Sequence, residues 1–337
     1  MATIVHTCSS VLIRPNGIVR YINAVMDLQR SQGHEVIFVT DSKPSQILNA
    51  DRILYANDVS TYVPNMRDGH VWLQVDNKLA AQIKTVYKQN KLAADLVIAH
   101  DLHGYLGLAP VFANGIFIQH ESDVLTPGSR YSFLSDEYLT QQISIANNTT
   151  WRIGLTVDSG NITPPRAVYT PSPMIPVTMP FMPKSRGLLY MGDATERKGA
   201  KEFMEVARKL GVTPTVITHE PDAELFAGAD VHTFGLHERD AMYELMAKHK
   251  VAFISSKNEC PGLVVLECLQ FMPVVVDSQY FWTNYLSDLG VYRVTGDAIV
   301  ATISDLLSEK DDTPGHYSLA LHNWCNNSKK LWTNLIA

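Results

Sequence analysis

Short, continuous runs of apolar residues alternate with amphipathic segments along most of this sequence, and this alternation restricts the possible folds most strongly. Such runs are typical of strands that are buried on both faces in a parallel sheet. In the first half, the expected strands are Thr3–His6, Glu35–Thr40, Leu96–Ala99, Gly115–Ile118 and Arg152–Val157. Between the first two, apolar residues at helical spacing from Ile18 to Met26 predict a helix that Gly33 ends.

The same alternation restarts in the second half of the chain. The expected strands there are Leu188–Met191, Pro214–Thr218, Val231–Phe234, Val251–Ser255 and Pro273–Asp277. Helical spacing of apolar residues is found after Gly199 and around Met242. The sequence therefore predicts an α/β protein with two doubly wound, Rossmann-like sheets, each with its ligand site at the carboxyl ends of the strands.

A proline-rich stretch separates the two halves. It contains Pro164, Pro165, Pro171, Pro173, Pro176, Pro180 and Pro183. Because proline lacks a backbone N–H, this stretch suits neither a helix nor a central strand. We expect an N-terminal domain at 1–165, a linker at 166–186 and a C-terminal domain at 187–315. An amphipathic helix at 316–337 could cross back to the first domain.

Composition narrows the class of protein. The chain has 337 residues, of which 46% are hydrophobic and 18% charged, which is enough apolar content for two buried cores. Its net charge of −6 gives no global attraction to polyanions. The four cysteines lack disulfide or zinc spacing, and no signal peptide or membrane-spanning run is present. We therefore expect a cytoplasmic protein with free thiols and no transmembrane segment.

The segment from Ser255 to Asp277 carries the most chemical information. A strand ends at Ser255, a polar loop with Glu259 follows, and Pro261 is expected at the first helical residue. Glu267 is expected nearly two turns into that helix. The free N–H groups of a helix N-terminus suit a diphosphate, and carboxylates accept hydrogen bonds from sugar and ribose hydroxyls. The backbone of Gly262 and Leu263, together with Pro261, forms the expected N-terminus.

Two other loops follow expected strands and carry suitable residues. In Tyr190–Gly199, the cations Arg197 and Lys198 precede a glycine, which suits a phosphate. In the first βα loop, Gly17 precedes the helix, where it either lets the backbone approach a ligand or simply forms a turn.

Polar clusters also follow two strands of the first half. His120, Glu121 and Asp123 follow the strand that ends at Ile118, at a position where α/β domains place catalytic groups. His100, with Asp101 and His103, follows another strand. This second cluster lacks a third histidine or a carboxylate at the fixed spacing of a metal site, so a hydrogen-bonded lining is favoured over a metal site.

Glu259 and Glu267, with seven residues between them, resemble the Glu-x₇-Glu motif of retaining glycosyltransferases of the GT-B fold, especially family four. The resemblance implies that Glu259 contacts the transferred sugar and Glu267 the nucleotide ribose. Lys198 matches the family's phosphate-binding loop, but Asp193 stands where the family has an arginine, and Arg197 could supply that cation. The resemblance further implies two domains that face each other across a cleft, with the domain at 1–165 on the acceptor side and the domain at 187–315 binding the donor. It implies a UDP-sugar as the donor and no required cofactor or metal.

The run Ile116–Leu125 also resembles α-glucosyltransferases of T-even phages, which modify 5-hydroxymethylcytosine in DNA. His120 and Glu121 match a Gln-His-acid run in those enzymes, which implies that both are catalytic together with Glu259. This second resemblance implies that glucose or a pentose such as arabinose is transferred to DNA. It also implies a phage-encoded enzyme that acts in the cytoplasm of the host. Candidate acceptor-side residues are Asp123, His100, Arg14 and Arg130.

Two alternatives stay open at this point. One is a glycosyltransferase with a lipid-linked or polysaccharide acceptor. The other is a catalytically silent protein that binds a nucleotide sugar, which the replacement at Asp193 keeps open. A basic helical stretch with Lys78, Lys84, Lys88 and Lys91 could meet DNA phosphate or an anionic membrane, although a solvated face is the more common reason for such a pattern.

Overall fold

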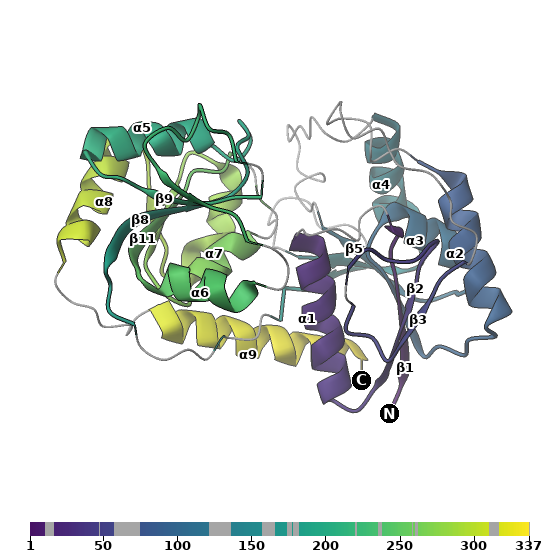
Figure 1. Ribbon diagram of the computed structural model, residues 1–337. Coiled ribbons are helices and arrows are strands. Elements are labelled where there is room, and N and C mark those ends of the chain that lie inside the picture. The colour runs from purple at the N-terminus through teal and green to yellow at the C-terminus, as the bar shows by residue number, and fades with distance from the viewer. Residues whose placement is uncertain are drawn as a thin grey trace. The chain divides into compact units, whose positions relative to one another are not determined.

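The chain folds into two compact units, Met1–Met174 with Asn327–Ala337, and Ile175–Asn326. The structure is a computed structural model (Figure 1). It describes residues 1–10, 17–46, 48–56, 75–120, 136–156, 166–173, 177, 182–219, 221–234, 238–257, 259, 262–309 and 317–336.

The first unit contains a seven-stranded sheet in the order β3-β2-β1-β4-β5-β6-β7, in which all pairs are parallel. Its strands are β1 Thr3–Thr7, β2 Glu35–Val39, β3 Arg52–Leu54, β4 Leu96–Ala99, β5 Ile116–Gln119, β6 Arg152–Leu155 and β7 Ala167–Tyr169. The helices between them are α1 Gly17–Ser31, α2 Asn77–Gln89, α3 Leu102–Leu108 and α4 Asp136–Asn148.

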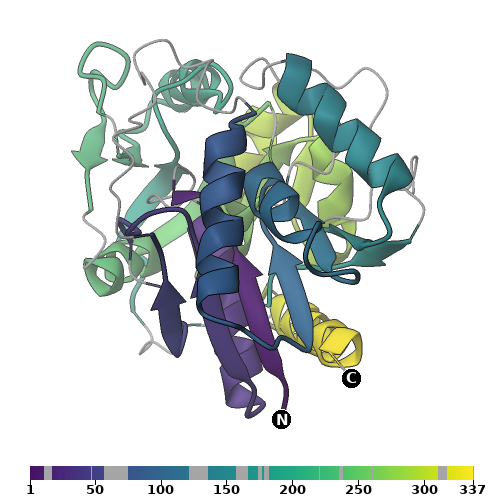
Figure 2. The ribbon, with the colours of Figure 1, turned by 90° about the vertical axis from the view of Figure 1, so that its right-hand side faces the viewer.

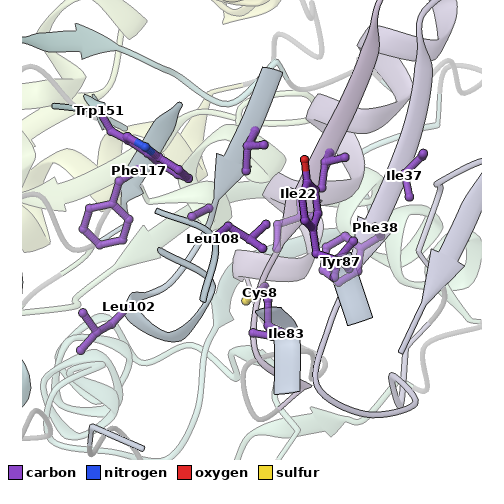
Figure 3. Close-up of a cluster of buried hydrophobic side chains, with 14 of the residues drawn as sticks. Cys8, Ile22, Ile37, Phe38, Ile83, Tyr87, Leu102, Leu108, Phe117 and Trp151 are labelled. Carbon is purple, nitrogen blue, oxygen red and sulfur yellow. The ribbon is translucent and has the colours of Figure 1, made fainter. Parts of the chain in front are cut away.

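Helices cover both faces of this sheet. Figures 1 and 2 show α1 on one face and α2 with α3 on the other. Each helix turns an apolar stripe to the strands, as the 3.6-residue period requires. Figure 3 shows part of the resulting core, with Ile22 of α1, Tyr87 of α2 and Trp151 among its buried members. Gly115 is needed beside Trp151, because a Cβ at Gly115 would lie 2.7 Å from the indole.

The second unit repeats this plan with a six-stranded parallel sheet in the order β10-β9-β8-β11-β12-β13. Its strands are β8 Arg186–Met191, β9 Thr215–Ile217, β10 Asp230–His232, β11 His249–Ile254, β12 Val274–Asp277 and β13 Tyr292–Val294. The helices are α5 Ala200–Leu210, α6 Arg239–Ala247, α7 Leu263–Cys268, α8 Asp297–Ser308 and a 3₁₀ helix, Phe281–Leu289. Figure 1 shows α5 and α8 on one face of the sheet and α6 with α7 on the other.

Both sheets reverse their strand order beside their first strand. In the first unit β1 lies between β2 and β4, and in the second unit β8 lies between β9 and β11. Such a switch point leaves a crevice beyond the carboxyl ends of the two central strands, where open α/β sheets bind their ligands. The predicted fold class, an α/β protein with two doubly wound parallel sheets, is confirmed.

The structure differs from the sequence prediction in the segment 166–186. This segment, which we expected to be linker only, contains β7 and the first residue of β8. β7 is compatible with its proline-rich neighbourhood because it is an edge strand and has no proline itself, while Pro171 and Pro173 follow it.

The C-terminal helix α9, Tyr317–Ile336, contributes its last turns to the first unit. Trp332 is fully buried there, and its Nε1 donates a hydrogen bond to the carbonyl of Pro171 at 2.9 Å. Gln32 Nε2 donates to Thr333 Oγ1 at 2.6 Å. The end of the chain is therefore part of the core that holds α1 in place.

Replacing Trp332 by alanine tests this role. The change Trp332→Ala should lower the free energy of unfolding by about 3–5 kcal/mol, because it leaves a large cavity. The exposed His322 on the same helix provides a control, since His322→Ala should change stability by less than about 0.5 kcal/mol. Urea denaturation of the full chain measures both, and equal effects of the two changes would contradict the packing described here.

Candidate functional site

The central feature of the second unit is an ion pair between Lys198 and Glu259. Lys198 follows β8 and Glu259 follows β11, and these two strands pair in parallel, so their carboxyl ends lie at one edge of the sheet. Lys198 Nζ lies 2.5 Å from Glu259 Oε1, and the side chains are only 14% and 11% exposed. Ser256 Oγ donates to the same Oε1 at 2.6 Å. Two residues that the sequence singled out separately are thus in direct contact.

The backbone holds the two loops together behind this pair. Gly199 has a left-handed backbone (φ +67°), and a Cβ there would lie 2.0 Å from the carbonyl oxygen of Ser255. Ser255 Oγ donates to the carbonyl of Gly199 at 2.7 Å, and the N–H of Lys257 donates to the carbonyl of Arg197 at 2.8 Å. Only glycine permits so close an approach of one loop to the other.

The charge state of the pair follows from its surroundings. Burial alone would raise the pKa of Glu259, but the cations Lys198 and Arg197 and the hydrogen bonds from Lys198 and Ser256 outweigh it and hold the pKa below its usual value. Glu259 is therefore ionised at neutral pH. Lys257, in contrast, is committed to Glu196 and Glu202 at 3.1 and 2.9 Å.

Helix α7 corrects the expected position of its N-terminus. It begins at Leu263, with Gly262 in a left-handed conformation (φ +68°) as the N-cap, so Pro261 does not occupy the first helical position. Proline fixes φ near −65°, which suits a first helical turn, but the left-handed turn at Gly262 intervenes. Pro261 itself lies outside the described residues.

Glu267 lies about one turn into α7, rather than the two turns expected. It is 1% exposed, and its carboxylate lies 3.8 Å from a guanidinium nitrogen of Arg239, the first residue of α6. Arg239 Nε in turn donates to the hydroxyl of Tyr243 at 2.6 Å. The charge of this buried carboxylate is thus balanced by a cation that sequence reasoning did not single out.

In the first unit, three histidines form a row at the ends of neighbouring strands. His6 lies in β1, His100 follows β4 and His120 follows β5. His6 Nδ1 lies 2.8 Å from His100 Nε2, and His100 Nδ1 lies 3.3 Å from His120 Nε2. His6 Nε2 lies 2.6 Å from Gln29 Oε1 on α1.

Burial keeps this row neutral. It lowers the pKa of His6 to about 4, against an opposing effect of the Gln29 hydrogen bond. It lowers the pKa of His120 to about 3, although Asp101 acts in the opposite direction. The pKa of His100 lies well below its usual value because of burial and the neighbouring histidines.

Asp101 and His103 have structural partners. Asp101 accepts hydrogen bonds from Gly104 N at 2.7 Å, where it caps α3, and from Ser9 Oγ at 2.5 Å. His103 Nδ1 lies 3.4 Å from the same carboxylate, and its Nε2 accepts from Asp76 N at 3.1 Å. Within the described ranges, no group of three His, Cys, Asp or Glu side chains is arranged to hold a metal ion.

Four of the remaining residues that the sequence singled out lie outside the described residues, whereas Gly17 and Asp193 have a described position. Arg14, Glu121, Asp123 and Arg130 lie outside the described residues. Gly17 is the exposed first residue of α1. Asp193, at the position of the family's arginine, accepts a hydrogen bond from Tyr190 through its backbone carbonyl at 2.9 Å.

Sequence reasoning missed the residues that support the two clusters. Ser256, Trp282, His6, Gln29 and Tyr21 had no local signal beyond a polar or aromatic residue within an apolar context. Trp282 Nε1 donates to the carbonyl of Ser256 at 2.8 Å and so fixes the backbone of the loop that carries Glu259. His6 offered one usable hint, because a histidine inside a buried strand needs partners for both ring nitrogens.

No described helix has both the length and the apolar character needed to span a bilayer. A search of protein-family models finds no match to the sequence. Curated proteins likewise give no match.

Solved structures define the class of the fold, which is that of GT-B glycosyltransferases. Sucrose-phosphate synthase from Thermosynechococcus elongatus matches with a TM-score of 0.70 at 15% identity, over 98% of this chain and 95% of that one. AviGT4, a glycosyltransferase of avilamycin A biosynthesis, matches with 0.61 at 16% identity, over 100% and 98%. Anabaena HepE in complex with UDP-glucose matches with 0.64 at 11% identity, over 100% and 99%.

The contact between the loops generates a prediction with a matched control. Gly199 and Gly211 flank α5, and both have a left-handed backbone, but a Cβ at Gly211 would meet nothing within 4 Å. Gly211→Ala should therefore cost only the left-handed penalty, about 1–2 kcal/mol. Gly199→Ala should lower the free energy of unfolding by clearly more, because the two loops must also separate. It should also weaken the binding of any ligand held by Lys198. Comparable unfolding midpoints in urea would contradict this account.

Proposed function

We propose that this protein is a retaining glycosyltransferase whose second unit binds a UDP-sugar. The observation that carries the proposal is the contact between Lys198 and Glu259 at the switch point of the second sheet. A cation and an ionised carboxylate, held side by side on rigid loops, suit a diphosphate and an adjacent sugar hydroxyl respectively. Retention of the anomeric configuration rests on the resemblance of the Glu259–Glu267 motif.

The proposed chemistry uses the charges that are present. Loss of the nucleoside diphosphate leaves negative charge on its oxygen, and fixed cations stabilise this charge most in the transition state. Lys198 has three N–H donors, of which Glu259 uses one. Arg197 and the backbone of Pro261, Gly262 and Leu263 are the further proposed phosphate contacts.

The remaining donor contacts follow from the same resemblance. Glu267 is the proposed partner of the ribose hydroxyls, and Gly17 is a further proposed donor-binding residue. The UDP moiety is supported by HepE, whose solved structure contains UDP-glucose. The donor is a substrate, and the proposed reaction requires no cofactor and no metal.

Two substitutions should separate binding from transfer. Lys198→Met removes the cation and should weaken UDP binding about 10- to 100-fold, because a charged hydrogen bond is lost. Glu259→Gln should leave UDP binding intact or stronger while reducing sugar transfer, since it removes the carboxylate but frees Lys198. Titration calorimetry with UDP measures the first effect, and Lys201→Met, which changes an exposed lysine on α5, provides the control. Equal UDP affinity of Lys198→Met and Lys201→Met would refute the site.

For the acceptor, the proposal is 5-hydroxymethylcytosine in DNA. Its supports are the resemblance of the run around His120 and the lysines of α2, of which Lys78 and Lys88 are exposed. Catalytic roles for His120 and Glu121 and acceptor contacts by Asp123 belong to this proposal. So do acceptor contacts by His100, Arg14 and Arg130. An enzyme that acts on a base in a duplex must first extrude it, which favours basic surface nearby.

The acceptor is tested by the mass of the product nucleosides. The protein is incubated with UDP-glucose or UDP-arabinose and with DNA that contains either hydroxymethylcytosine or cytosine. A mass increase of one glycosyl unit on hydroxymethylcytosine alone is the expected result. Transfer to a lipid-linked or polysaccharide acceptor instead would overturn the DNA acceptor but keep the transferase. UDP-sugar binding without transfer to any of them would indicate a silent binding protein.

A further inference from the structure

The histidine row of the first unit is buried along its whole length, with a small increase in exposure from His6 to His120. His6 is fully buried, His100 is 2% exposed and His120 is 4% exposed. The inner end of the row is closed by the side chain of Gln29, which is also fully buried. At the outer end, His120 Nδ1 is the one ring nitrogen of the row without a partner among the described residues, whereas the other five are all used within the row.

With Oε1 of Gln29 facing His6 Nε2, the contacts of the row determine where each proton of a neutral row lies. A neutral imidazole carries one N–H, and its other nitrogen can only accept. The amide oxygen Oε1 of Gln29 also can only accept, so the proton of His6 lies on Nε2. His6 Nδ1 must then accept from His100 Nε2–H, and His100 Nδ1 must accept from His120 Nε2–H. The last nitrogen, Nδ1 of His120, is left with a lone pair.

We propose that Gln29 and His6 are positioning residues that hold His120 in its Nε2–H tautomer, so that Nδ1 accepts a hydrogen bond from a hydroxyl of the bound sugar. The identity of the ligand as a sugar rests on the proposed function. The tautomer of His120 depends only on the contacts of the row.

The side chain of Gln29 leaves one of its own buried polar groups without a hydrogen bond among the described residues, which indicates that its amide oxygen has a specific role. Its Nε2 is buried and has no hydrogen-bond partner within the described part of the chain. A buried unpaired donor costs about 1–3 kcal/mol, and an apolar side chain of similar size would avoid this cost. An apolar side chain would instead leave His6 Nε2–H without an acceptor, so the amide serves as the neutral acceptor of His6.

A carboxylate at position 29 would not serve the same purpose. It would favour a proton on both nitrogens of His6, and His6 Nδ1–H would then donate to His100 and reverse the row. The other groups that face the row leave its direction unchanged. Tyr21 meets His120 edge-on at 4.9 Å between ring centres, but its hydroxyl donates to the carbonyl of Thr170 at 2.7 Å. The carboxylate of Asp101 is engaged by Ser9 and by the N–H of Gly104.

The tautomers can be measured directly by long-range ¹H–¹⁵N correlation spectra of the ¹⁵N-histidine-labelled full chain at pH 7, assigned by triple-resonance spectra of the wild type. The expected result is an Nε2–H tautomer for His6, His100 and His120 alike. In Gln29→Met, which preserves size, His120 should show a substantial Nδ1–H population with little change in the urea unfolding midpoint. Gln32→Met, three residues further along, should leave all three tautomers unchanged. An Nδ1–H tautomer of His120 in the wild type, or no change in Gln29→Met, would overturn the proposal.

The role of the lone pair is tested separately with UDP-glucose. Binding should move the ¹⁵N resonance of His120 Nδ1 in the wild type but much less in Gln29→Met, and kcat/KM for transfer should fall about tenfold in the variant, as expected for one lost hydrogen bond. If UDP-glucose binds in calorimetry without moving this resonance, the contact with the sugar is wrong. If UDP-glucose does not bind at all, the proposed donor fails, whereas the tautomer measurement still decides the role of Gln29.

Discussion

Parallel pairing about a central strand governs where polar groups can be placed in each unit. Because the strands are buried on both faces, most side chains along them are apolar, and polar groups gather near the strand ends. The reversal of strand order beside β1 and beside β8 then separates the following loops and opens space at that edge. The histidine row and the ion pair of Lys198 occupy the corresponding positions of the two sheets, so one constraint accounts for both clusters.

The two clusters solve the problem of buried polar groups in opposite ways. In the second unit, Glu259 stays charged because a cation lies beside it and a hydroxyl donates to it. In the first unit, no such cation faces His6 or His100 among the described residues, and burial makes both histidines neutral. A neutral row can be satisfied only if its donors and acceptors alternate in one direction, so a single amide at its end sets its orientation. Two opposite charges instead need to lie close together. The close contact of Gly199 with Ser255 brings the loops of Lys198 and Glu259 near enough for this.

The sequence was sufficient for features that repeat locally. Buried strands such as Leu96–Ala99 have continuous apolar runs, and β4 has those same bounds. Among the described strands, the four edge strands have three residues each, a length too short to show a period; β10 lay in a predicted run, whereas β3, β7 and β13 were missed. Lys198 and Glu259 could be singled out from their loops, but they are 61 residues apart and their contact depends on the pairing of β8 with β11. The start of α7 was misplaced because proline was taken as its first residue, whereas a left-handed glycine caps the helix. Gln29 could not be found at all, because its partner lies on another element and its own neighbours in α1 are unremarkable.

The contact between Lys198 and Glu259 also bears on the replacement of arginine by Asp193. A partly buried ion pair must offset the loss of hydration of both charges, so the pair gives little net stability. In the proposed site, the pair keeps the ammonium group oriented before a ligand arrives, since an unpaired lysine would sample many rotamers. A diphosphate would then meet a cation that is already in place, and Glu259 would share it instead of losing it, because the ammonium has further donors. The backbone carbonyl of Asp193 accepts a hydrogen bond from Tyr190, and in the proposed site Lys198 takes the phosphate contact without an arginine nearer the strand.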